Sequence, residues 1–322
     1  MTITTNPQTS LTPTTRAAIS GLGTARGHKV VTNHDLTLTL DTSDEWIIER
    51  SGIRERRIGG SCLELSTEAA RKALTQAQVQ PQELDLIICA TCTPDQVFPA
   101  VSNRLQNELE ANCGAFDLNA ACSGFTYGVT VAEAQIAAGM ERILVVGVDT
   151  LSRFTDWNDR STAVLFGDGA GAIVLERTHN TQKGILSTFL GSEGRFADLL
   201  TCDFGGYIQM EGKEVFRQAV RVMVSASQQV LAAAGLTPQD VDVVVPHQAN
   251  MRIIESAMKR LSIPLQKAST VLETTGNTSS SSIPLALDAA VSKGLIQDNS
   301  LVLMVGFGAG MSVAAALVRW GQ

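Results

Sequence analysis

Long apolar runs are missing from this 322-residue chain. No uninterrupted apolar stretch reaches the ~18 residues that a membrane span needs. The opening MTITTNPQTSLTPTT also lacks the basic and then apolar layout of a secretory signal, and we expect residues 1–16 to form a flexible N-terminal tail. The sequence therefore predicts a globular protein that does not enter a membrane.

Metal-ligating and phosphate-binding patterns are scarce as well. The four histidines form no H-x-x-x-H or clustered arrangement, so no metal site is expected. The glycine-rich segments 166–171 and 306–310 lack both the G-x-G-x-x-G spacing and a Gly-Lys-Ser/Thr sequence, which argues against a nucleotide loop. Their glycines instead suit close approach of two backbones, or an amide placed beside a reacting carbonyl. A net charge of -7 lacks the Lys and Arg excess of general nucleic-acid binding.

The six cysteines follow no secretory signal, so we expect free thiols in a reducing compartment, by default the cytoplasm. Two of them form a C-x-x-C sequence, Cys89-Ala90-Thr91-Cys92. This sequence leaves an apolar strand and lacks the helix-starting context of a redox pair. We interpret the two cysteines as small buried residues at the end of a strand.

The length and the 44% hydrophobic content allow a large core in two halves, which we place at residues 17–178 and 179–322. Apolar runs that alternate with amphipathic ones favour an α/β fold whose sheets are covered by helices on both faces. The predicted strands lie near residues 17–22, 85–91, 114–118, 142–147, 171–176, 241–245, 301–306 and 312–319. The predicted helices cover residues 66–78, 98–110, 122–139, 214–234, 250–261 and 281–293.

An internal repeat relates the two halves. The segment PQELDLII at residues 81–88 recurs as PQDVDVVV at residues 238–245, an offset of 157. In each copy a turn enters a strand, and a helical run precedes it. Under an offset of 155, Cys122 corresponds to Asn277, so we expect both to begin corresponding helices. His247 follows the second copy of the repeated strand, at the position where the first copy has Ala90. All three residues thus lie where a strand ends or a helix begins, the favoured end for ligands in such sheets.

The chemistry of Cys122, His247 and Asn277 fits acyl transfer. A cysteine at a helix N-terminus feels unpaired N–H groups and the positive end of the helix dipole, which favour the thiolate. Small neighbours, Ala120 to Gly124, leave room around the sulfur. Each residue also has a plain structural interpretation: a buried cysteine, a histidine bonded to a carbonyl and an asparagine that caps a helix. Their placement at corresponding junctions favours the catalytic interpretation.

Several motifs resemble the β-ketoacyl-acyl-carrier-protein synthase III enzymes, the initiating condensing enzymes of type II fatty acid synthesis. The resemblance covers about residues 18–320. It implies a thiolase-like fold with two pseudo-symmetric halves in an αβαβα arrangement of layers. The motifs are DTSDEWI at 41–47, SGIRER at 51–56, ACSGF at 121–125, FGDGAG at 166–171, PHQAN at 246–250, GNTS at 276–279 and ALVRW at 316–320.

The resemblance implies a ping-pong reaction without a cofactor, in which a CoA thioester and a phosphopantetheine thioester are substrates. Cys122 would take an acyl group from acyl-CoA, with the backbone N–H groups of Cys122 and Ala309 as the oxyanion hole. His247 and Asn277 would then bind the thioester oxygen of malonyl-acyl-carrier protein while carbon dioxide leaves. The enolate would attack the acyl-cysteine and give 3-oxoacyl-acyl-carrier protein.

The resemblance also implies binding residues and a homodimer. Phe98 would reach across the dimer to close the acyl pocket. An acidic carrier protein should meet a basic dock, for which Arg217, Arg252, Lys259 and Arg260 are the candidates, although a solvated charged face is the plain alternative. The implied CoA and pantetheine contacts are Thr42, Trp46, Arg50, Arg160, Phe216, Ala249 and Asn250.

Departures from the family pattern leave the primer open. Ser161 stands where a glycine commonly follows the CoA-contacting arginine, Ala309 replaces the middle residue of a Gly-Gly-Gly run, and segment 191–210 is shorter than usual. A degradative thiolase would need a second cysteine near the C-terminal glycine loop, but the last cysteine is Cys202. A non-catalytic partner that controls chain length would lack Cys122. The remaining alternative is an acyltransferase that passes the acyl group from Cys122 to an oxygen or nitrogen without decarboxylation.

Overall fold

The computed structural model describes residues 15–321, and its strands form two principal sheets. The predicted tail over residues 1–16 lies almost wholly outside this range, and Arg16 is already the first residue of a strand. In the N-terminal sheet, the order is β1-β7-β6-β4-β5, with β4 parallel to β5 and β6, and with β7 antiparallel to β1 and β6. Its strands are β1 (Arg16–Arg26), β4 (Leu86–Ala90), β5 (Gly114–Leu118), β6 (Arg142–Thr150) and β7 (Asp168–Thr178).

The C-terminal sheet repeats this pattern in the order β8-β13-β12-β11. Its strands β11 and β12 are parallel, and β13 is antiparallel to β12 and β8. A single parallel bridge between Val244 and Ala268 stands where β5 stands in the first sheet. The strands are β8 (Gly184–Ser192), β11 (Val243–Pro246), β12 (Leu301–Gly308) and β13 (Ser312–Arg319). The repeat predicted from the sequence is therefore a repeat of topology.

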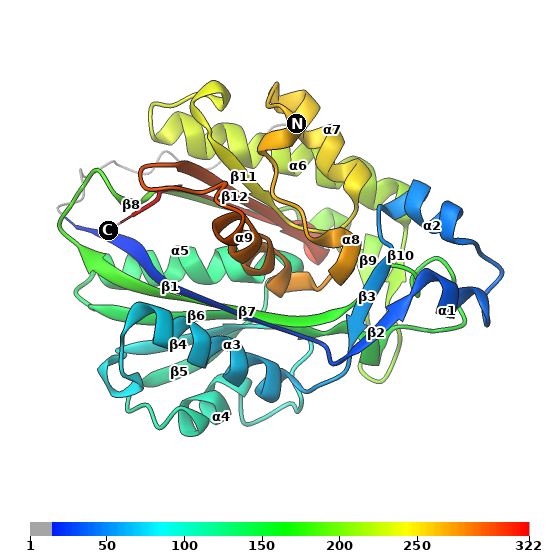
Figure 1. Ribbon diagram of the computed structural model, residues 1–322, viewed down its shortest axis with the longest axis horizontal. Coiled ribbons are helices and arrows are strands. Elements are labelled where there is room, and N and C mark those ends of the chain that lie inside the picture. The colour runs from blue at the N-terminus through cyan, green and yellow to red at the C-terminus, as the bar shows by residue number, and fades with distance from the viewer. Residues whose placement is uncertain (1–14, 322) are drawn as a thin grey trace.

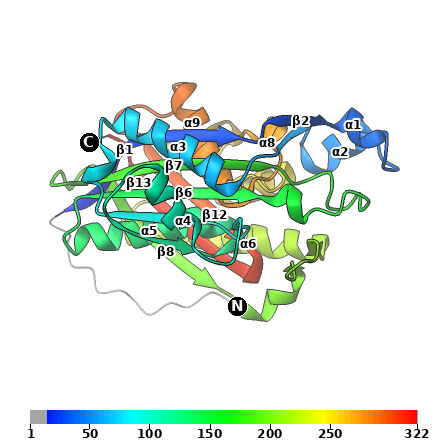
Figure 2. The ribbon, with the colours of Figure 1, turned by 90° about the horizontal axis from the view of Figure 1, so that it is seen from below.

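Helices form three layers around the two sheets, which confirms the predicted αβαβα fold (Figure 1). The helices α3 and α4 cover the outer face of the N-terminal sheet, and Figure 2 shows them in front of it. The central layer consists of α5 and α9, while α6 and α7 cover the outer face of the C-terminal sheet. These helices are α3 (Cys62–Ala77), α4 (Val101–Glu108), α5 (Gly124–Ala137), α6 (Gly212–Ala233), α7 (Met251–Leu261) and α9 (Ser282–Ser292).

The core explains why these segments take their conformations. All five residues of β4 are buried, as expected for a parallel strand with helices on both faces. Between the sheets, Phe125 and Val129 of α5 and Ile283 and Leu287 of α9 pack into one cluster with side chains of both sheets. No helix within residues 15–321 is long and apolar enough to cross a membrane.

Several short elements escaped the sequence analysis. Strand β8 was not predicted, and a small sheet of β2 and β3 carries charged residues that hide its pattern. Helix α2 begins after Ser43, whose hydroxyl accepts a hydrogen bond from Trp46 N (3.1 Å). The short elements are β2 (Lys29–Thr32), α1 (Asn33–Thr37), α2 (Asp44–Ser51), β3 (Glu55–Ile58), β9 (Leu200–Thr201), β10 (Gln209–Met210) and α8 (Leu272–Thr275).

Candidate active site

Two corresponding turns meet where the halves join. The 3₁₀ turn Ala121–Ser123 leads from β5 into α5, and the 3₁₀ turn Ser279–Ser281 leads into α9. The two turns contact each other across the interface. Each begins with a left-handed residue other than glycine, Ala121 at φ 46° and Ser279 at φ 54°. Such backbone conformations are costly and concentrate at functional sites.

The geometry corrects one expectation from the repeat. The two turns and the helices after them correspond under an offset of 158, so the counterpart of Cys122 is Ser280 and not Asn277. Asn277 lies five residues before α9 and does not begin it. The predicted relation of His247 holds, because Leu86 and Val243 begin β4 and β11 at the offset of 157.

The turn Ala121–Ser123 lies against the C-terminal glycine loop. A β-carbon at Gly308 would lie 2.7 Å from Cys122 N, so only glycine allows the two backbones this approach. Hydrogen bonds from Ser123 N to Ala120 O and from Gly124 N to Ala121 O close the turn, and neither uses the N–H of Cys122. That N–H is therefore free of the turn and lies beside the loop that continues into Ala309.

Burial opposes ionisation of the Cys122 thiol. It raises the pKa of Cys122 to about 12, a hydrogen bond with the Ser279 hydroxyl acts in the opposite direction, and the charge of Asp149 raises the pKa further. Cys122 does precede the N-terminus of α5, as predicted. The expected thiolate is nevertheless not the favoured form in the ligand-free protein, because desolvation outweighs what the helix end provides.

His247 is fully buried and has one ring nitrogen free. Burial lowers the pKa of His247 to about 3, so the ring is neutral at physiological pH. Its Nδ1 lies 2.6 Å from Ser282 Oγ, which also accepts from Gln248 N (3.2 Å). With Gln248 N donating to its oxygen, the Ser282 hydroxyl has its own proton available for Nδ1, and in that arrangement the ring proton lies on Nε2. Nε2 is buried without a partner among the described residues.

His247 and the turn Ala121–Ser123 both lie next to Gly306. A β-carbon at Gly306 would lie 3.6 Å from His247 Cβ and 3.7 Å from Ser123 Cα. The ring of Phe307 packs edge-on against the imidazole, with ring centroids 5.2 Å apart. The imidazole is thus held from two sides, by Ser282 and by an aromatic ring, next to the segment that carries Cys122.

Asn277 is held by its backbone and by its side-chain oxygen. Asn277 N donates to Leu165 O (2.8 Å), and Asn277 O accepts from Gly167 N (2.9 Å). The carboxamide Oδ1 accepts from Ser279 N (2.9 Å), so Asn277 caps the 3₁₀ turn and leaves Nδ2 as the donor of the side chain. The Ser279 hydroxyl in turn contacts Cys122, so Ser279 connects Asn277 to Cys122.

A buried carboxylate, Asp149, joins the two halves and was missed by the sequence analysis. It is fully buried, and no cation pairs with it in the described part of the chain. One oxygen accepts from Thr93 Oγ1 and Cys92 N (both 2.8 Å) and from Thr91 Oγ1 (3.1 Å), and the other accepts from Ser280 Oγ (2.7 Å) and Ser280 N (3.1 Å). Asp149 thus fixes the Ser279–Ser281 turn against the end of β4. No local motif signals this role.

Four of the predicted CoA contacts gather at the edge of the molecule. The Trp46 ring lies between two guanidinium groups, that of Arg160 at 5.1 Å and that of Arg50 at 5.8 Å from the ring centroid. Arg160 also donates to Asp41 O (2.7 Å) beside Thr42, whose buried hydroxyl has no partner among residues 15–321. These residues form an aromatic patch with two arginines, of which Arg160 also lies 3.8 Å from Asp41 Oδ2.

The remaining predicted contacts lead inward from this patch. Asn250 Nδ2 donates to Arg50 O (2.8 Å), and Asn250 Oδ1 accepts from Arg252 N (2.9 Å) as the cap of α7. The Arg252 guanidinium lies 5.9 Å from the Phe216 ring centroid. Ala249 is partly buried against the same cluster as Phe216. The chain therefore connects the Trp46 patch through α7 to the strand end that carries His247.

The candidate dock residues differ in whether their charge is already paired. Arg252, Lys259 and Arg260 are exposed on α7, whereas Arg217 on α6 is already paired with Glu214 (2.6 Å). The side chain of Phe98 is 82% exposed on the surface of the subunit.

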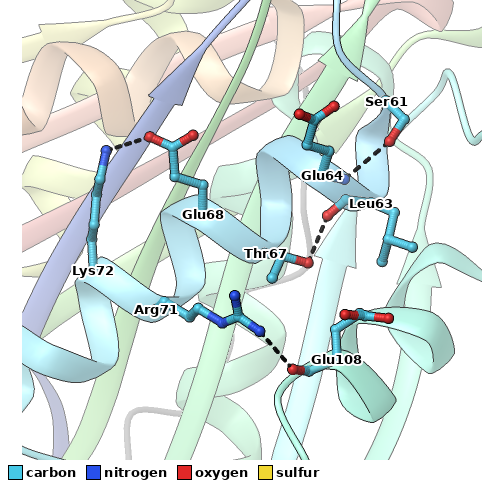
Figure 3. A pocket seen from close by; sticks show the side chains of 8 residues that line it. All are labelled: Ser61, Leu63, Glu64, Thr67, Glu68, Arg71, Lys72 and Glu108. Atoms are coloured by element: carbon cyan, nitrogen blue, oxygen red, sulfur yellow. Dashed lines mark hydrogen bonds and ion pairs between the residues drawn. The ribbon is translucent and has the colours of Figure 1, made fainter.

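One surface hollow lies away from these groups. It has a volume of about 610 Å³ and is open to solvent on the outer side of α3. Figure 3 shows that both of its basic side chains have partners, Lys72 with the carboxylate of Glu68 and Arg71 with the carbonyl of Glu108. Because none of the predicted site residues lines it, we assign the site to the turns between the halves and not to this hollow.

The chain is similar to known proteins in sequence and in structure. Two family models match the chain, one described as 3-oxoacyl-[acyl-carrier-protein] synthase III over residues 116–194, and one as its C-terminal part over residues 231–320. The β-ketoacyl-[acyl-carrier-protein] synthase III 1 of Bacillus anthracis is 49% identical over 309 residues, which cover 94% of this chain and 99% of that protein. The corresponding synthase III of Alkalilimnicola ehrlichii is 47% identical over 322 residues, with coverage of 94% and 99%. The crystal structure of 3-oxoacyl-[acyl-carrier-protein] synthase III from Aquifex aeolicus has a TM-score of 0.93 at 44% identity and covers 94% of this chain and 100% of that one.

Proposed function

The chain belongs to the 3-oxoacyl-[acyl-carrier-protein] synthase III family, and from this premise we propose how its residues carry out the condensation that initiates fatty acid synthesis. Cys122 is the nucleophile, and the backbone N–H groups of Cys122 and Ala309 form the oxyanion hole. His247 and Asn277 bind the thioester oxygen of the second substrate. Acyl-CoA and malonyl-acyl-carrier protein are the substrates that the family implies.

In the first step, the Cys122 sulfur attacks the carbonyl carbon of acyl-CoA. The oxyanion that forms accepts hydrogen bonds from the two backbone N–H groups, and its collapse breaks the bond between carbon and the CoA sulfur. The thiol proton ends on the CoA sulfur, so the step neither gains nor loses a proton. This coupling suits a thiol with a pKa of about 12, because the free thiolate need not accumulate.

In the second step, the malonyl carboxylate leaves as carbon dioxide, and the bonding electrons pass into an enolate. His247 Nε2–H and Asn277 Nδ2–H donate to the thioester oxygen, on which the charge develops. The enolate carbon attacks the acyl-cysteine, and the collapse of that intermediate releases 3-oxoacyl-acyl-carrier protein and the Cys122 thiolate, which takes up one proton from solvent to regenerate the thiol. Each donor is worth about 3 to 4 kcal/mol in such a dry site, so losing one should slow condensation about a hundredfold or more.

A single observation carries this proposal: the neutral His247 ring, with Nδ1 occupied by Ser282 and Nε2 buried without a partner. A buried polar nitrogen without a partner is costly unless a ligand supplies one. A general base would need a free lone pair on Nε2, whereas this tautomer offers a proton. The imidazole is therefore suited to stabilise an enolate oxygen.

The charged aromatic patch supports a route for CoA. We assign the adenine end to Trp46 and the arginines Arg50 and Arg160, with Thr42 beside them, because an aromatic ring between guanidinium groups suits a flat base with phosphates. The pantetheine arm would follow Asn250 inward to the site. Phe216 and Ala249 complete the wall of that route.

The exposed basic side chains of α7 are proposed as the dock for the carrier protein. Arg252, Lys259 and Arg260 present positive charge on one helix near the Trp46 patch. Arg217 is retained in the proposal, although its ion pair with Glu214 lowers the charge that it offers. An acidic carrier protein would gain rate and orientation from this face even though the whole chain is acidic.

The exposed apolar loop around Phe98 supports a homodimer. Val97 and Phe98 are 78% and 82% exposed, and the loop that holds them is fixed by Asp95, which accepts from Cys62 N and Leu63 N (both 2.9 Å). Strand β5 is a sheet edge next to this loop and exposes Phe116. Unpaired sheet edges and exposed apolar side chains are the usual material of a subunit interface.

The domain boundary and the cellular compartment are also proposed. We propose that the two halves meet as domains between β7 and β8, where the predicted boundary falls. We also propose the cytoplasm as the compartment, because all six cysteines are free thiols.

The test is the release of labelled carbon dioxide from carboxyl-labelled malonyl-acyl-carrier protein. We expect release that depends on acyl-CoA and that falls at least a hundredfold in His247→Ala and Asn277→Ala, while both variants still form the acyl-enzyme. Acyl transfer to an oxygen or nitrogen acceptor without release would instead support the alternative acyltransferase and contradict the proposal.

A further inference from the structure

The cysteines of the C-x-x-C sequence face different parts of the molecule. Cys89 is fully buried and packs in the cluster under α3 and α4. Cys92 packs beside Leu151, Phe166 and Ile208 on the side of the active site and keeps some exposure. The two thiols therefore do not form a redox pair with each other, and Cys92 faces the nucleophile.

One hydroxyl group links Cys92 to Cys122. Cys92 Sγ lies 3.8 Å from Ser279 Oγ, and the same hydroxyl forms a hydrogen bond with Cys122. The two thiols are also close enough for the charge of one to act on the other. Their backbones leave neighbouring parallel strands, β4 and β5, where Thr91 N donates to Leu118 O (3.1 Å).

Cys92 also has a proton acceptor at hand. Its Sγ lies 3.4 Å from Asp149 Oδ1, the carboxylate that holds the end of β4. The other cysteines lack this combination. Cys62 is fully buried, as is Cys89, while Cys113 and Cys202 have no contact with the site residues.

We propose that Cys92 is a resolving thiol, which forms a disulfide with Cys122 once a hydroperoxide has oxidised the nucleophile. The bond would block acyl loading reversibly and protect Cys122 from irreversible oxidation. Formation of the bond does not depend on the proposed function, whereas its effect on loading does.

The chemistry balances in two steps. The Cys122 sulfur attacks the peroxide, the O–O bond breaks, and Cys122 becomes a sulfenic acid while the peroxide is reduced to water. The Cys92 sulfur then attacks the Cys122 sulfur, passes its proton to Asp149, and displaces hydroxide, which takes that proton and leaves as water. Both side chains must turn past the Ser279 hydroxyl to reach the S–S distance of about 2 Å. A dithiol reductant reverses the bond.

The test uses the full-length protein and hydrogen peroxide at mildly alkaline pH, where more of the thiol ionises. Remaining thiols are alkylated under denaturing conditions, and the intact mass is measured. We expect two fewer alkylated thiols than in the reduced protein. Trypsin should yield one linked pair, in which residues 73–104 carry Cys92 and residues 105–142 carry Cys122.

Two variants make the assignment specific. Cys92→Ser should give no linked pair and should instead accumulate the sulfinic or sulfonic acid of Cys122, with loading lost even after reduction. Cys113→Ser, which removes the other thiol of the same tryptic peptide, should behave as wild type. Wild-type loading should return after dithiothreitol treatment.

The proposal is overturned if oxidised wild type contains no 92–122 link, or if Cys92→Ser recovers as fully as wild type. These outcomes are separate from failure of the proposed function. A protein that never forms an acyl-enzyme before oxidation contradicts the function, but it can still yield the linked peptide.

Discussion

Replacing Ser282 by alanine tests the assignment of the imidazole proton. The Ser282 hydroxyl lies 2.6 Å from His247 Nδ1 and accepts from Gln248 N at 3.2 Å, and all three groups are buried. The substitution keeps the imidazole in place but removes the group that holds the proton on Nε2. The ring can then adopt the other tautomer or rotate, so a smaller fraction of the enzyme offers a donor to the thioester oxygen.

The structure sets the size of both effects. Two buried groups lose a partner, and each loss costs about 1 to 2 kcal/mol, so the free energy of unfolding should fall by about 2 to 4 kcal/mol. The full donor is worth about 3 to 4 kcal/mol, and this variant should lose part of that. We expect condensation to slow about tenfold, less than in His247→Ala, because a tenfold change corresponds to about 1.4 kcal/mol.

The assay separates the two half-reactions. Acyl loading is followed by the intact mass of the protein after mixing with acyl-CoA, and condensation by carbon dioxide release from the loaded protein. Ser281→Ala is the matched control, because its buried hydroxyl donates to Thr278 O (2.8 Å) and does not touch His247. The control should lose stability without losing condensation.

Wild-type condensation in Ser282→Ala would refute the reasoning, since the imidazole would then need no partner at Nδ1. An equal loss in Ser281→Ala would also refute it, because the effect would then reflect the packing of the α9 N-terminus and not the tautomer.

Three further predictions follow from other parts of the site. Gly308→Ala should slow acyl loading at least a hundredfold, because its β-carbon would lie 2.7 Å from Cys122 N. The control Gly194→Ala places a β-carbon with nothing within 4 Å and should load normally. Equal loading in both variants would contradict the close approach of Gly308 to Cys122. His247→Gln should flatten the acid branch of the stability curve. The histidine has a pKa of about 3 in the folded state and 6.5 in the unfolded state, so the unfolded state binds more protons between these pH values. The free energy of unfolding of wild type should therefore fall by up to about 5 kcal/mol as the pH drops from 6.5 to 3. Denaturant titrations at each pH measure this change. An identical slope in the variant would show that other groups cause the loss. Arg252→Glu should raise KM for malonyl-acyl-carrier protein about tenfold or more while acyl loading stays unchanged; a matching loss in both steps would count against the dock.

Much of the architecture was predictable because its signals are local. Strands such as β4 and β11 are short apolar runs bounded by turns, and the repeat of residues 81–88 at 238–245 relates the two halves without any other sequence. The small sheet of β2 and β3 escaped detection, because Glu55–Ile58 carries three charged residues out of four.

The sequence indicates candidate site residues but not the contacts that hold them. Cys122, His247 and Asn277 were chosen from their places at strand and helix ends. The register between Cys122 and Asn277 was wrong by three positions, because α5 has 14 residues and α9 has 11, so the helix ends correspond under an offset of 155 but the helix starts do not. Burial raises the pKa of Cys122, and burial is a tertiary property that the local sequence does not reveal. Asp149 reaches Ser280 across 131 positions, and no spacing rule reveals such a contact.

The most direct test of the central claim is where an acyl group from acyl-CoA attaches. Peptide mapping of the loaded protein should find the adduct on Cys122 alone, and it should persist in His247→Ala and vanish in Cys122→Ala. An adduct on another residue, or one that remains in Cys122→Ala, would contradict the account.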